Sequence, residues 1–249
     1  MRKDLYEVME KRKSIRKYDM KPLNSVLLQQ IKQYGEEVNP LIPDIRVKFN
    51  VYSYEEVKSL MAIKAPHYVG IYSEKKDNFL LNAGYMLQQM DLYLSANNLG
   101  SCWLGMAKPS AALPEAVDGL DFVIMLAFGN PKEEVHRSSK SEFKRKTLEE
   151  IREGSGYEEV LEAARLAPSA RNSQTWYFIC KEKEILVCRK PAGFVSEHLM
   201  ARLNTIDVGI AMCHLDLALE NRALERNITF EDIEVPKGFI HLATVRLLE

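Results

Sequence analysis

The fold of this chain is decided by a segment that reads GYMLQQMDLYL and spans residues 84–94. A second segment, GIAMCHLDLAL at residues 209–219, aligns with it without a gap. The first Gly, the Asp-Leu pair and the last Leu coincide in the two segments. Each segment lies in a long apolar stretch that predicts a largely buried helix. The alignment therefore indicates that the chain contains one kind of domain twice.

The same order of predicted elements surrounds both segments. The first half predicts helices over 3–12 and from Asn24 or Ser25 to about Gly35, strands over 47–52 and 68–72, a helix over 79–99 that Gly100 ends, and a strand over 122–128. The second half predicts a helix over 157–166, strands over 176–180 and 185–188, a helix over 204–224 and a strand over 239–247. Apolar periodicity and the Gly, Pro and Asn residues at element ends support these assignments.

We therefore expect an α+β fold with two similar halves, each having an antiparallel-rich sheet flanked by helices around a long central helix. A charged stretch over 132–152 has few apolar residues and is typical of an exposed crossing segment. It places the boundary between the halves, so we expect residues 1–150 to form the first half and residues 151–249 the shorter second half.

The bulk properties exclude several classes of function. Lys plus Arg total 34 and Asp plus Glu total 35, so the chain lacks the basic excess of a general nucleic-acid-binding protein. The N-terminus has no apolar signal-peptide core and no apolar run is long enough to span a bilayer, so we expect a soluble cytoplasmic protein. The five His and four Cys residues show no metal-ligand spacing, and no Ser/His/Asp or Cys/His set stands out. The cysteines are expected to be reduced, partly buried small hydrophobic residues.

The first of two unusual motifs, RKSIRKY, spans residues 12–18. In an extended segment its spacing puts Arg12, Ser14 and Arg16 on the same side. Two guanidinium groups that flank a hydroxyl suit a phosphate or an electron-rich ring edge, because arginine donates two hydrogen bonds at once and stays charged. The alternative is a solvated basic turn after a helix.

The second motif, APSARNSQTW, spans residues 167–176 and follows a predicted helix that Pro168 ends. Its Ser, Asn and Gln side chains supply several neutral donors and acceptors on one loop. That density of polar groups, closed by Trp176, suits the edge of a planar heterocycle. A helix-capping loop with no ligand is the alternative.

Together these motifs resemble the nitroreductase family of flavin enzymes, whose members carry an R-x-S-x-R/K element and an AP-S-x-x-N-x-Q-P-W loop. Further segments are similar to that family: LGSCWLG at 99–105 resembles its LG-x-x-W-x-G turn, and GNP at 129–131 and FKRKTLEE at 143–150 also match. The resemblance covers most of the chain. It departs from the family at Thr175, where Pro is usual.

The resemblance implies FMN as the cofactor, bound by residues from both halves. The implied cofactor-binding residues are Arg12, Ser14, Arg16, Leu104, Gly105, Lys144 and Lys146 from the first half and Pro168, Ser169, Ala170, Asn172 and Gln174 from the second. The converse site lacks its motifs, since the first half has no Ser-x-x-Asn loop and the second has no Arg-x-Ser-x-Arg element. We therefore expect a monomer that acts as a pseudo-dimer and holds one FMN per chain, with further oligomerisation left open.

Family chemistry also implies a role for each group. Arg12, Lys144 and Lys146 would neutralise the FMN phosphate, and Ser14 would bond to the phosphate or the ribityl chain. Arg16 would stabilise the negative charge on the pyrimidine edge of the reduced flavin. The backbone amides of Leu104 and Gly105 would meet the N5 and O4 edge. Asn172 and its neighbours would clamp the ring or the ribityl chain.

The implied function is an FMN-dependent oxidoreductase that uses NADH or NADPH to reduce nitro or quinone-type small molecules by ping-pong hydride transfer. Flavin N5 would perform the chemistry, so no catalytic side chain and no metal are expected. One alternative is a flavin-binding sensor, a storage protein or a degenerate non-catalytic protein. Another is flavin-dependent dehydrogenation or dehalogenation of a metabolite, which the sequence does not separate from the first reading.

Overall fold

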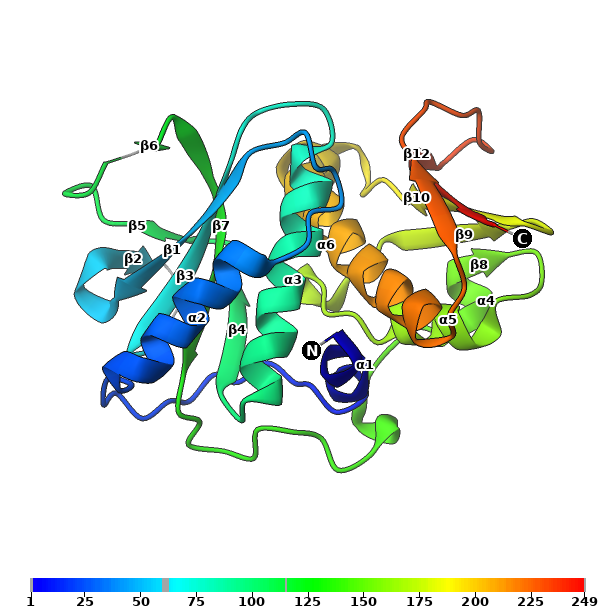
Figure 1. The fold of residues 1–249 in the computed structure, drawn as a ribbon. Helices are drawn as coiled ribbons and strands as arrows, with labels where there is room; N and C mark the ends of the chain where they lie inside the picture. The colour runs from blue at the N-terminus through cyan, green and yellow to red at the C-terminus, as the bar shows by residue number, and fades with distance from the viewer. Residues whose placement is uncertain (1, 60–62, 115, 249) are drawn as a thin grey trace. The chain divides into compact units, whose positions relative to one another are not determined.

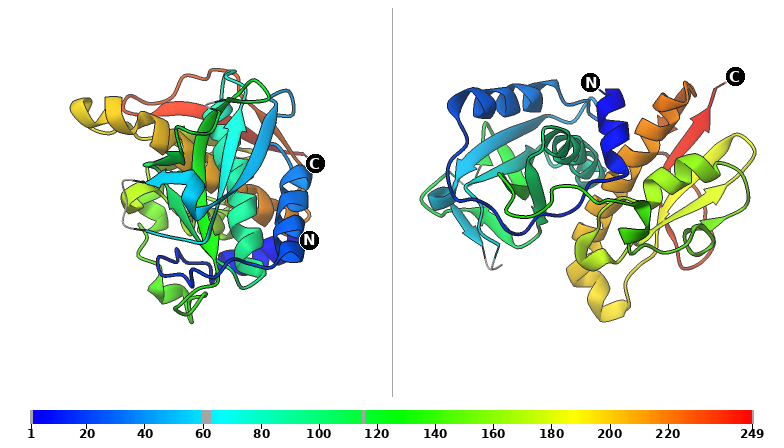
Figure 2. Two further views of the ribbon diagram at one scale, coloured as in Figure 1. Left: turned by 90° about the vertical axis from the view of Figure 1, so that its left-hand side faces the viewer. Right: turned by 90° about the horizontal axis from the view of Figure 1, so that it is seen from below.

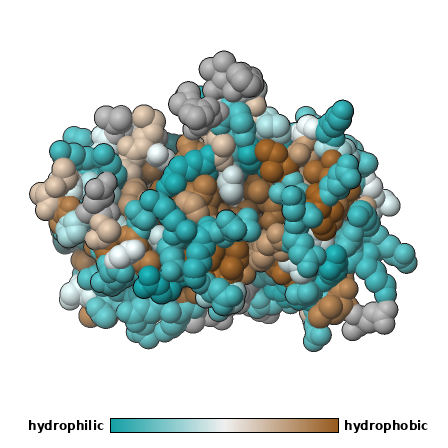
Figure 3. All heavy atoms as spheres, turned by 90° about the horizontal axis from the view of Figure 1, so that it is seen from above, coloured by the Kyte–Doolittle hydropathy of each residue, from teal (hydrophilic) through white to brown (hydrophobic). Residues whose placement is uncertain are grey.

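A computed structural model describes residues 2–59, 63–114 and 116–248 of the chain (Figure 1). The chain folds into two compact units. Unit 1 contains residues 1–10 and 143–249, and unit 2 contains residues 11–142. No helix in the described ranges is both long and apolar enough to cross a membrane. The face drawn in Figure 3 is mostly hydrophilic.

Unit 2 contains two helices and a main antiparallel sheet. Its elements are α2 (Ser25–Glu37), β1 (Val47–Ser53), the short 3-10 helix η1 (Tyr54–Glu56), β2 (Val57–Ser59), β3 (His67–Ser73), α3 (Phe79–Ala96), β4 (Gly100–Leu104), β5 (Ala107–Pro109), β6 (Ala116–Val117), β7 (Leu120–Gly129) and the 3-10 helix η2 (Lys140–Glu142). The strand order of the main sheet is β1-β3-β7-β4, and β6 pairs with the start of β7. β2 and β5 form a separate two-stranded sheet.

The long helix α3 forms the centre of unit 2. It packs on β3, β4 and β7 (Figure 2). It buries polar as well as apolar side chains. α2 packs against β1 and α3. The side chain of Asn24 accepts a hydrogen bond from the N–H of Leu27 at 2.8 Å, which confirms Asn24 as the N-cap of α2.

Unit 1 has a second sheet around the longest helix of the described chain. Its elements are α1 (Arg2–Met9), α4 (Leu148–Ile151), β8 (Arg152–Glu153), α5 (Glu158–Arg165), the 3-10 helix η3 (Ala170–Asn172), β9 (Trp176–Cys180), β10 (Glu184–Arg189), α6 (Phe194–Asn221), β11 (Arg226–Thr229) and β12 (Ile240–Leu247). The strand order is β11-β12-β10-β9-β8, with β8 parallel to β9 and the other pairs antiparallel.

The N-terminal helix α1 folds with unit 1. It packs against α6, which also contacts α5, β9 and β10. The predicted apolar face of this helix, Leu5, Val8 and Met9, is buried. The apolar face of α1 packs on α6, and Arg145 bonds to the end of α5. For these reasons unit 1 includes residues 2–10 and 143–150, which we had expected in the first half.

The two sheets share one strand order. Apart from β8 and the short strands β2, β5 and β6, two strands precede the long helix of each unit and two follow it, in the orders β1-β3-β7-β4 and β9-β10-β12-β11. The pairing of the second strand with the last also shifts register at one corresponding point, after Ile71 in unit 2 and after Val187 in unit 1. One residue of the last strand is left out of the ladder at each shift, as in a β-bulge.

The long helices end in the same way. The N–H of Leu99 donates to the Leu94 carbonyl at 2.9 Å, and the N–H of Leu224 donates to the Leu219 carbonyl at 3.0 Å. A left-handed residue precedes each donor, with φ of 58° at Asn98 and 54° at Ala223. These residues occupy corresponding positions of the sequence alignment, and the geometry is that of a left-handed helix C-cap.

Several predicted elements differ from the structure. The prediction that Gly100 ends the first long helix is wrong, because the helix ends at Ala96 and Gly100 begins β4. The second long helix begins at Phe194 rather than at Asn204. The strand β11 was not predicted, and the segment expected as an LG-x-x-W-x-G turn is mostly the strand β4, with only Gly105 and Met106 in a turn. The other predicted strands are confirmed to within one or two residues.

Candidate functional site

The first motif forms an extended segment beside β4 in unit 2. The N–H of Ile15 donates to the Ser101 carbonyl at 2.9 Å, and Ser14 and Ser101 form a parallel bridge. The other side of the segment is bonded to residues that follow β7, where the N–H of Lys132 donates to the Lys17 carbonyl at 2.9 Å. The motif is therefore fixed from two sides as an additional, irregular strand.

Gly100 is required by the close approach of this segment. A Cβ atom at Gly100 would lie 2.7 Å from Cγ2 of Ile15, which is fully buried. Any larger side chain at this position would push the motif away from β4.

Arg12 lies in the interior of unit 2. Its side chain is 3 % exposed, and its Nε lies 2.6 Å from Oδ2 of Asp91 on α3, whose side chain is completely buried. The hydroxyl of Ser101 donates to Oδ1 of the same carboxylate at 2.5 Å. The charge of Arg12 is thus compensated inside the unit, which differs from the expected role as a cation for a phosphate. Arg12 instead fixes the start of the motif on α3.

Arg16 is exposed and lies at the far end of the motif. Its backbone N–H donates to Oε1 of Glu133 at 3.2 Å, while its guanidinium makes only a long 3.5 Å contact to the Ser14 carbonyl. A second arginine, Arg137, bonds to the carbonyl of Arg12, and burial lowers the pKa of its guanidinium to about 10. Sequence reasoning missed Arg137, which lies in the charged stretch that we had interpreted only as a crossing segment.

The predicted backbone donors at the end of β4 differ from each other in environment. Leu104 is fully buried in the sheet, opposite Met125 of β7. Gly105 follows it in an exposed turn. Within unit 2 the structure therefore brings together Arg12, Ser14 and Arg16 in one segment beside the strand that ends in Leu104.

The basic segment of unit 1 is bonded to the second motif through Arg145. Its Nε donates to the Ala167 carbonyl at 3.0 Å and its Nη2 to the Leu166 carbonyl at 3.1 Å. Its Nη1 donates to Oδ1 of Asn172 at 2.7 Å. A cation is favourable at this C-terminal end of α5, where carbonyl groups lack helical partners. Sequence reasoning selected the two neighbouring lysines and missed Arg145.

The predicted polar residues of the loop complete this network. Nδ2 of Asn172 donates to the Lys144 carbonyl at 2.8 Å, and Oε1 of Gln174 accepts from the N–H of Lys146 at 2.8 Å. Nζ of Lys146 donates to the carbonyls of Ser173 and Gln174 at 3.1 and 3.0 Å. Burial lowers the pKa of the Lys146 ammonium group, whereas the side chain of Lys144 is exposed. The structure thus brings Lys144, Lys146, Asn172 and Gln174 together within unit 1.

The loop itself has a strained backbone. Arg171, Asn172 and Gln174 all have positive φ angles, of 55°, 57° and 49°. Such conformations are uncommon outside glycine and are held only where the surroundings determine them. Here the hydroxyl of Ser169 accepts from the N–H of Gln174 at 3.0 Å, and Pro168 is buried at the loop entrance.

A buried carboxyl group on α6 holds the middle of the loop. The N–H of Ala170 lies 3.1 and 3.0 Å from the two carboxyl oxygens of Asp207. Burial raises the pKa of Asp207 to about 8, against a smaller lowering by the Ala170 hydrogen bond. At the corresponding position of α3, Oδ1 of Asn82 accepts from the N–H groups of Leu41 and Ile42. Both long helices therefore anchor a loop that precedes a strand, α3 the loop before β1 and α6 the loop before β9.

Three polar atoms of the second motif lack hydrogen-bond partners in the described part of the chain. They are Oγ of Ser173, Oγ1 of Thr175 and Nε1 of Trp176. Buried polar groups are nearly always paired, so an orphaned group needs an explanation such as a ligand or a water molecule. These three are grouped within four consecutive residues.

The histidines and cysteines form no comparable site. Nδ1 of His214 is 3.0 Å from the Ala163 carbonyl, and the four cysteines are all buried thiols. The side chain of His198 lies outside the described residues. Among the residues that the structure describes, no group of three or more His, Cys, Asp or Glu side chains is arranged to hold a metal ion.

Comparison with known proteins gives one family match. A family model described as "Putative TM nitroreductase" matches residues 4–219. No curated protein matches the chain. Among solved structures, a "putative nitroreductase" from Thermotoga maritima has a TM-score of 0.65 at 21 % identity, and the match covers 98 % of this chain and 93 % of that one. This likeness shows the fold.

Other solved structures match less of the chain. A nitroreductase family protein from Clostridium difficile has a TM-score of 0.46 at 17 % identity and covers 63 % of this chain and 97 % of its own. A Desulfovibrio desulfuricans protein solved with FMN has a TM-score of 0.45 at 18 % identity and covers 61 % of this chain and 97 % of its own.

Proposed function

The chain belongs to the family described as "Putative TM nitroreductase", and we propose on that premise that it is an FMN-dependent oxidoreductase. It would take electrons from NADH or NADPH and reduce a small molecule such as a nitroaromatic compound or a quinone by ping-pong kinetics. The observation that carries the proposal is the second motif, a strained loop with three orphaned polar atoms that is bonded to a basic segment.

The chemistry of the available groups fits FMN. A phosphate needs cationic donors, and the exposed side chains of Arg16 and Lys144 supply them. A flavin edge needs neutral donors and acceptors, and the hydroxyls of Ser173 and Thr175 and the indole N–H of Trp176 are unsatisfied in the described chain. None of these groups requires a metal ion.

We propose the residues of the two motifs as the cofactor site. The side chains of Ser14, Arg16, Lys144 and Lys146 would bind the phosphate, the ribityl chain and the pyrimidine edge. Arg12 would position the motif through Asp91 rather than touch the cofactor. The remaining contacts would come from Leu104, Gly105, Pro168, Ser169, Ala170, Asn172 and Gln174. When bound, FMN would supply the hydride transfer.

The side chains themselves would act through charge and position. The guanidinium of Arg16 would offset the negative charge that reduction places on the pyrimidine edge. The N–H of the exposed Gly105 would be available to a ring atom, while Leu104 is held rigidly in β4. Buried Pro168 and Trp176 would limit the access of water.

We also propose that the chain is a duplicated pseudo-dimer that works as a monomer with one FMN. The shared strand order, the matching helix ends and the equivalent loop anchors at Asn82 and Asp207 support the duplication. Each motif occurs in one unit only, which supports a single site. The proposed location is the cytoplasm, with no nucleic-acid or membrane partner.

The decisive experiment measures the molar ratio of FMN to polypeptide in purified protein and then titrates it anaerobically with NADH and NADPH. A ratio near one with rapid bleaching of the flavin is expected. A ratio near two would contradict the single site, and protein that refuses FMN on reconstitution would refute the proposal. Bound flavin that NAD(P)H does not bleach would indicate the alternative, a sensor or storage protein without turnover.

A substitution tests the role of Arg16. Arg16→Ala should slow flavin reduction by about 100-fold or more, the range for removing one electrostatic donor, with little change in unfolding. Arg46→Ala removes another exposed arginine of unit 2 and is the matched control. Equal flavin reduction in both variants would remove Arg16 from the site.

A further inference from the structure

Two lysines face each other across the small two-stranded sheet of unit 2. In the antiparallel pair of β2 with β5, Lys58 lies directly opposite Lys108 (Figure 1). Side chains at directly opposite positions project from the same face, with Cβ atoms about 5 Å apart. Like charges in this arrangement destabilise a sheet, so the pair needs an explanation other than stability.

Both ammonium groups project from the open face of this sheet. The opposite face is turned inward, because Ala107 is buried in a core cluster of unit 2 and Val57 packs against the same cluster. Lys58 and Lys108 alternate with these residues along their strands, and both are exposed. The two positive charges are therefore presented together to solvent.

Among the described residues, no acidic side chain forms an ion pair with Lys58 or Lys108. Elsewhere in unit 2, lysines on the surface have carboxylate partners. These ion pairs are Lys48 with Asp118, Lys75 with Asp121 and Lys76 with Glu74. The lysine pair of β2 and β5 thus differs from its surroundings in lacking a compensating charge, which a bound anion would supply.

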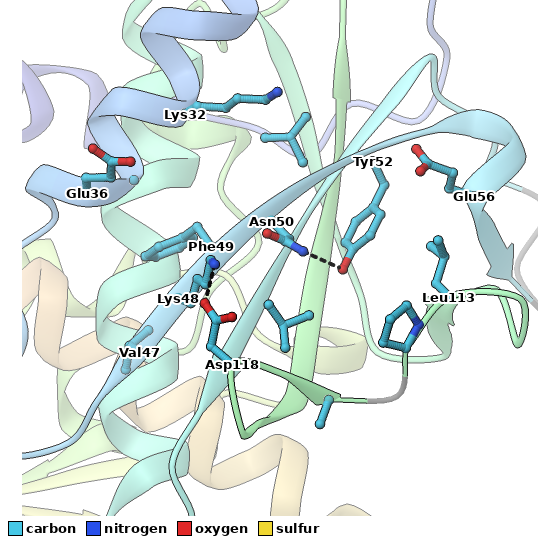
Figure 4. Close-up of a pocket in the computed structure, with 15 residues that line it drawn as sticks. Lys32, Glu36, Val47, Lys48, Phe49, Asn50, Tyr52, Glu56, Leu113 and Asp118 are labelled. Carbon is cyan, nitrogen blue, oxygen red and sulfur yellow. Dashed lines mark hydrogen bonds and ion pairs between the residues drawn. The ribbon is translucent and has the colours of Figure 1, made fainter.

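The acidic residues closest in sequence to Lys58 are Glu55 and Glu56, which precede β2. Oε2 of Glu56 accepts from the N–H of Ser53 at 2.7 Å, and Glu56 lines a separate cavity of about 710 Å³ beside β1 (Figure 4). Glu55 is exposed in η1 and forms no ion pair with a described residue. Both carboxylates are therefore unpaired with the two lysines.

The lysine pair is close along the chain to a residue proposed to meet the flavin. β5 begins two residues after Gly105, whose N–H is proposed to meet a ring atom of FMN. Lys108 is three residues beyond Gly105, so their Cα atoms are at most about 11 Å apart. Between them, Met106 is 59 % exposed and offers an apolar contact to a planar ring.

We propose that Lys58 and Lys108 bind the diphosphate bridge of the nicotinamide donor, an inference that rests on the proposed function. Each of the two adjacent phosphates carries one negative charge, which matches two ammonium groups on side chains about 5 Å apart. One ribose joins the bridge to the nicotinamide ring, so a ring near Gly105 can place its diphosphate at Lys108. A single carboxylate would leave one ammonium group unbalanced. NADH and NADPH share the bridge, so the pair binds both.

The test compares electron donors with and without a diphosphate. Anaerobic stopped-flow experiments follow flavin reduction in the FMN-loaded double variant Lys58→Gln/Lys108→Gln by NADH, by NADPH and by benzyl dihydronicotinamide, which has no phosphate. The apparent Kd for NADH and for NADPH should rise by about tenfold or more, the range for losing a hydrogen bond to a charged group. Reduction by the benzyl compound should not change. Lys21→Gln/Lys32→Gln removes two other exposed charges of unit 2 and is the matched control.

A binding measurement provides a readout that needs no turnover. ADP-ribose, which contains the diphosphate but no nicotinamide, is titrated into both proteins by calorimetry. The wild type should bind it about tenfold more tightly than the double variant, and added salt should weaken wild-type binding more, because exposed charges are screened. Lys108→Glu places an acid opposite Lys58. It should weaken ADP-ribose binding while raising the urea midpoint, since an opposite-charge pair replaces a like-charge pair.

Three outcomes would overturn the proposal. The first is equal affinity of the wild type and the double variant for ADP-ribose. The second is an equal loss of reduction by all three donors, which would assign the lysines to a step after donor binding. The third is loss of FMN from the double variant, which would assign them to the cofactor. In each case a wild type that binds FMN and is reduced by NADH leaves the proposed function intact, whereas a wild type that takes up no FMN refutes both.

Discussion

Units 1 and 2 carry an aspartate at the same position of their long helices but neutralise it differently. In unit 1, Asp216 pairs with Arg226, whose Nη2 lies 2.5 Å from Oδ1 and which begins the strand that follows the helix. In unit 2 the corresponding strand position is Ser101, and the cation is Arg12 from the added segment beside β4. Ser101 of β4 is neutral, and the cation that pairs with Asp91 comes from the first motif.

The largest expected difference between the units concerns the loop anchors. Unit 1 uses Asp207, whose pKa burial raises to about 8, where unit 2 uses the neutral Asn82. Below the unfolded-state pKa, near 4, the carboxyl is protonated in both states and the anchor is fully stabilising. As pH rises from 4 to 8 the unfolded state alone ionises, so the free energy of unfolding falls by an amount on the order of 5 kcal/mol.

Asp207→Asn gives unit 1 the anchor of unit 2 and should remove this dependence. Urea unfolding of both proteins between pH 4 and 9 measures the effect. The variant is expected to match the wild type near pH 4 and to exceed it increasingly up to pH 8. Parallel curves for the two proteins over this range would show that Asp207 does not titrate as described.

The next largest effect concerns the two ion pairs. Asp91→Ala leaves a buried Arg12 without its counter-ion and should lower the free energy of unfolding by about 3–5 kcal/mol. Asp216→Ala should lower it by only about 1–2 kcal/mol, because the Arg226 side chain is 19 % exposed and Glu220 lies 3.8 Å away. Chemical denaturation measures both.

A double variant separates loss of the pair from loss of packing. Arg12→Leu combined with Asp91→Leu removes both charges and should recover much of the stability lost in Asp91→Ala. Equal losses in the two single variants would mean that the pairs are equivalent after all.

A smaller effect is expected at the position that follows the helix end. Gly100→Ala brings a methyl group to 2.7 Å from Ile15 and should destabilise unit 2 by about 1–3 kcal/mol, with weaker FMN binding as the motif moves. The aligned residue in unit 1, Glu225, is exposed, and Glu225→Ala should change stability by less than about 0.5 kcal/mol. Thermal unfolding and FMN titration of both variants test this. If Gly100→Ala left the FMN affinity unchanged, the position of the first motif would not determine cofactor binding.

These contrasts also show how far the sequence predicts the structure. Two kinds of element were predicted because the sequence feature that marks them is local. They are strands with a continuous apolar run, such as 122–128, and the helix that Asn24 caps. The strands β4 and β11 were not predicted. Their sequences, GSCWL and RNIT, are short, begin with small or polar residues and do not alternate between apolar and polar residues. Gly100 was interpreted as a helix stop because its actual reason, contact with Ile15, joins residues far apart in the chain.

For the candidate site, too, only the features that lie in consecutive residues were predicted. The motifs themselves were found because their residues are consecutive, and each remains together in the structure. The partners of those residues were not: Asp91 for Arg12, Arg145 for Asn172 and Asp207 for Ala170. Each is contributed by another element, so no spacing within a motif reveals it. The internal alignment of 84–94 with 209–219 was the one signal that marked Asp91 in advance.

The smallest effect concerns the left-handed caps of the two long helices. Ala223 and Asn98 occupy equivalent positions with φ of 54° and 58°. Alanine pays a steric penalty of about 1 kcal/mol in this conformation, whereas asparagine tolerates it better and glycine adopts it freely. Ala223→Gly should therefore stabilise the protein by up to about 1 kcal/mol, and Asn98→Gly by clearly less, as measured by chemical denaturation. If Asn98→Gly proved the more stabilising change, the two caps would not be equivalent, and the argument that they descend from one ancestral helix end would lose its geometric support.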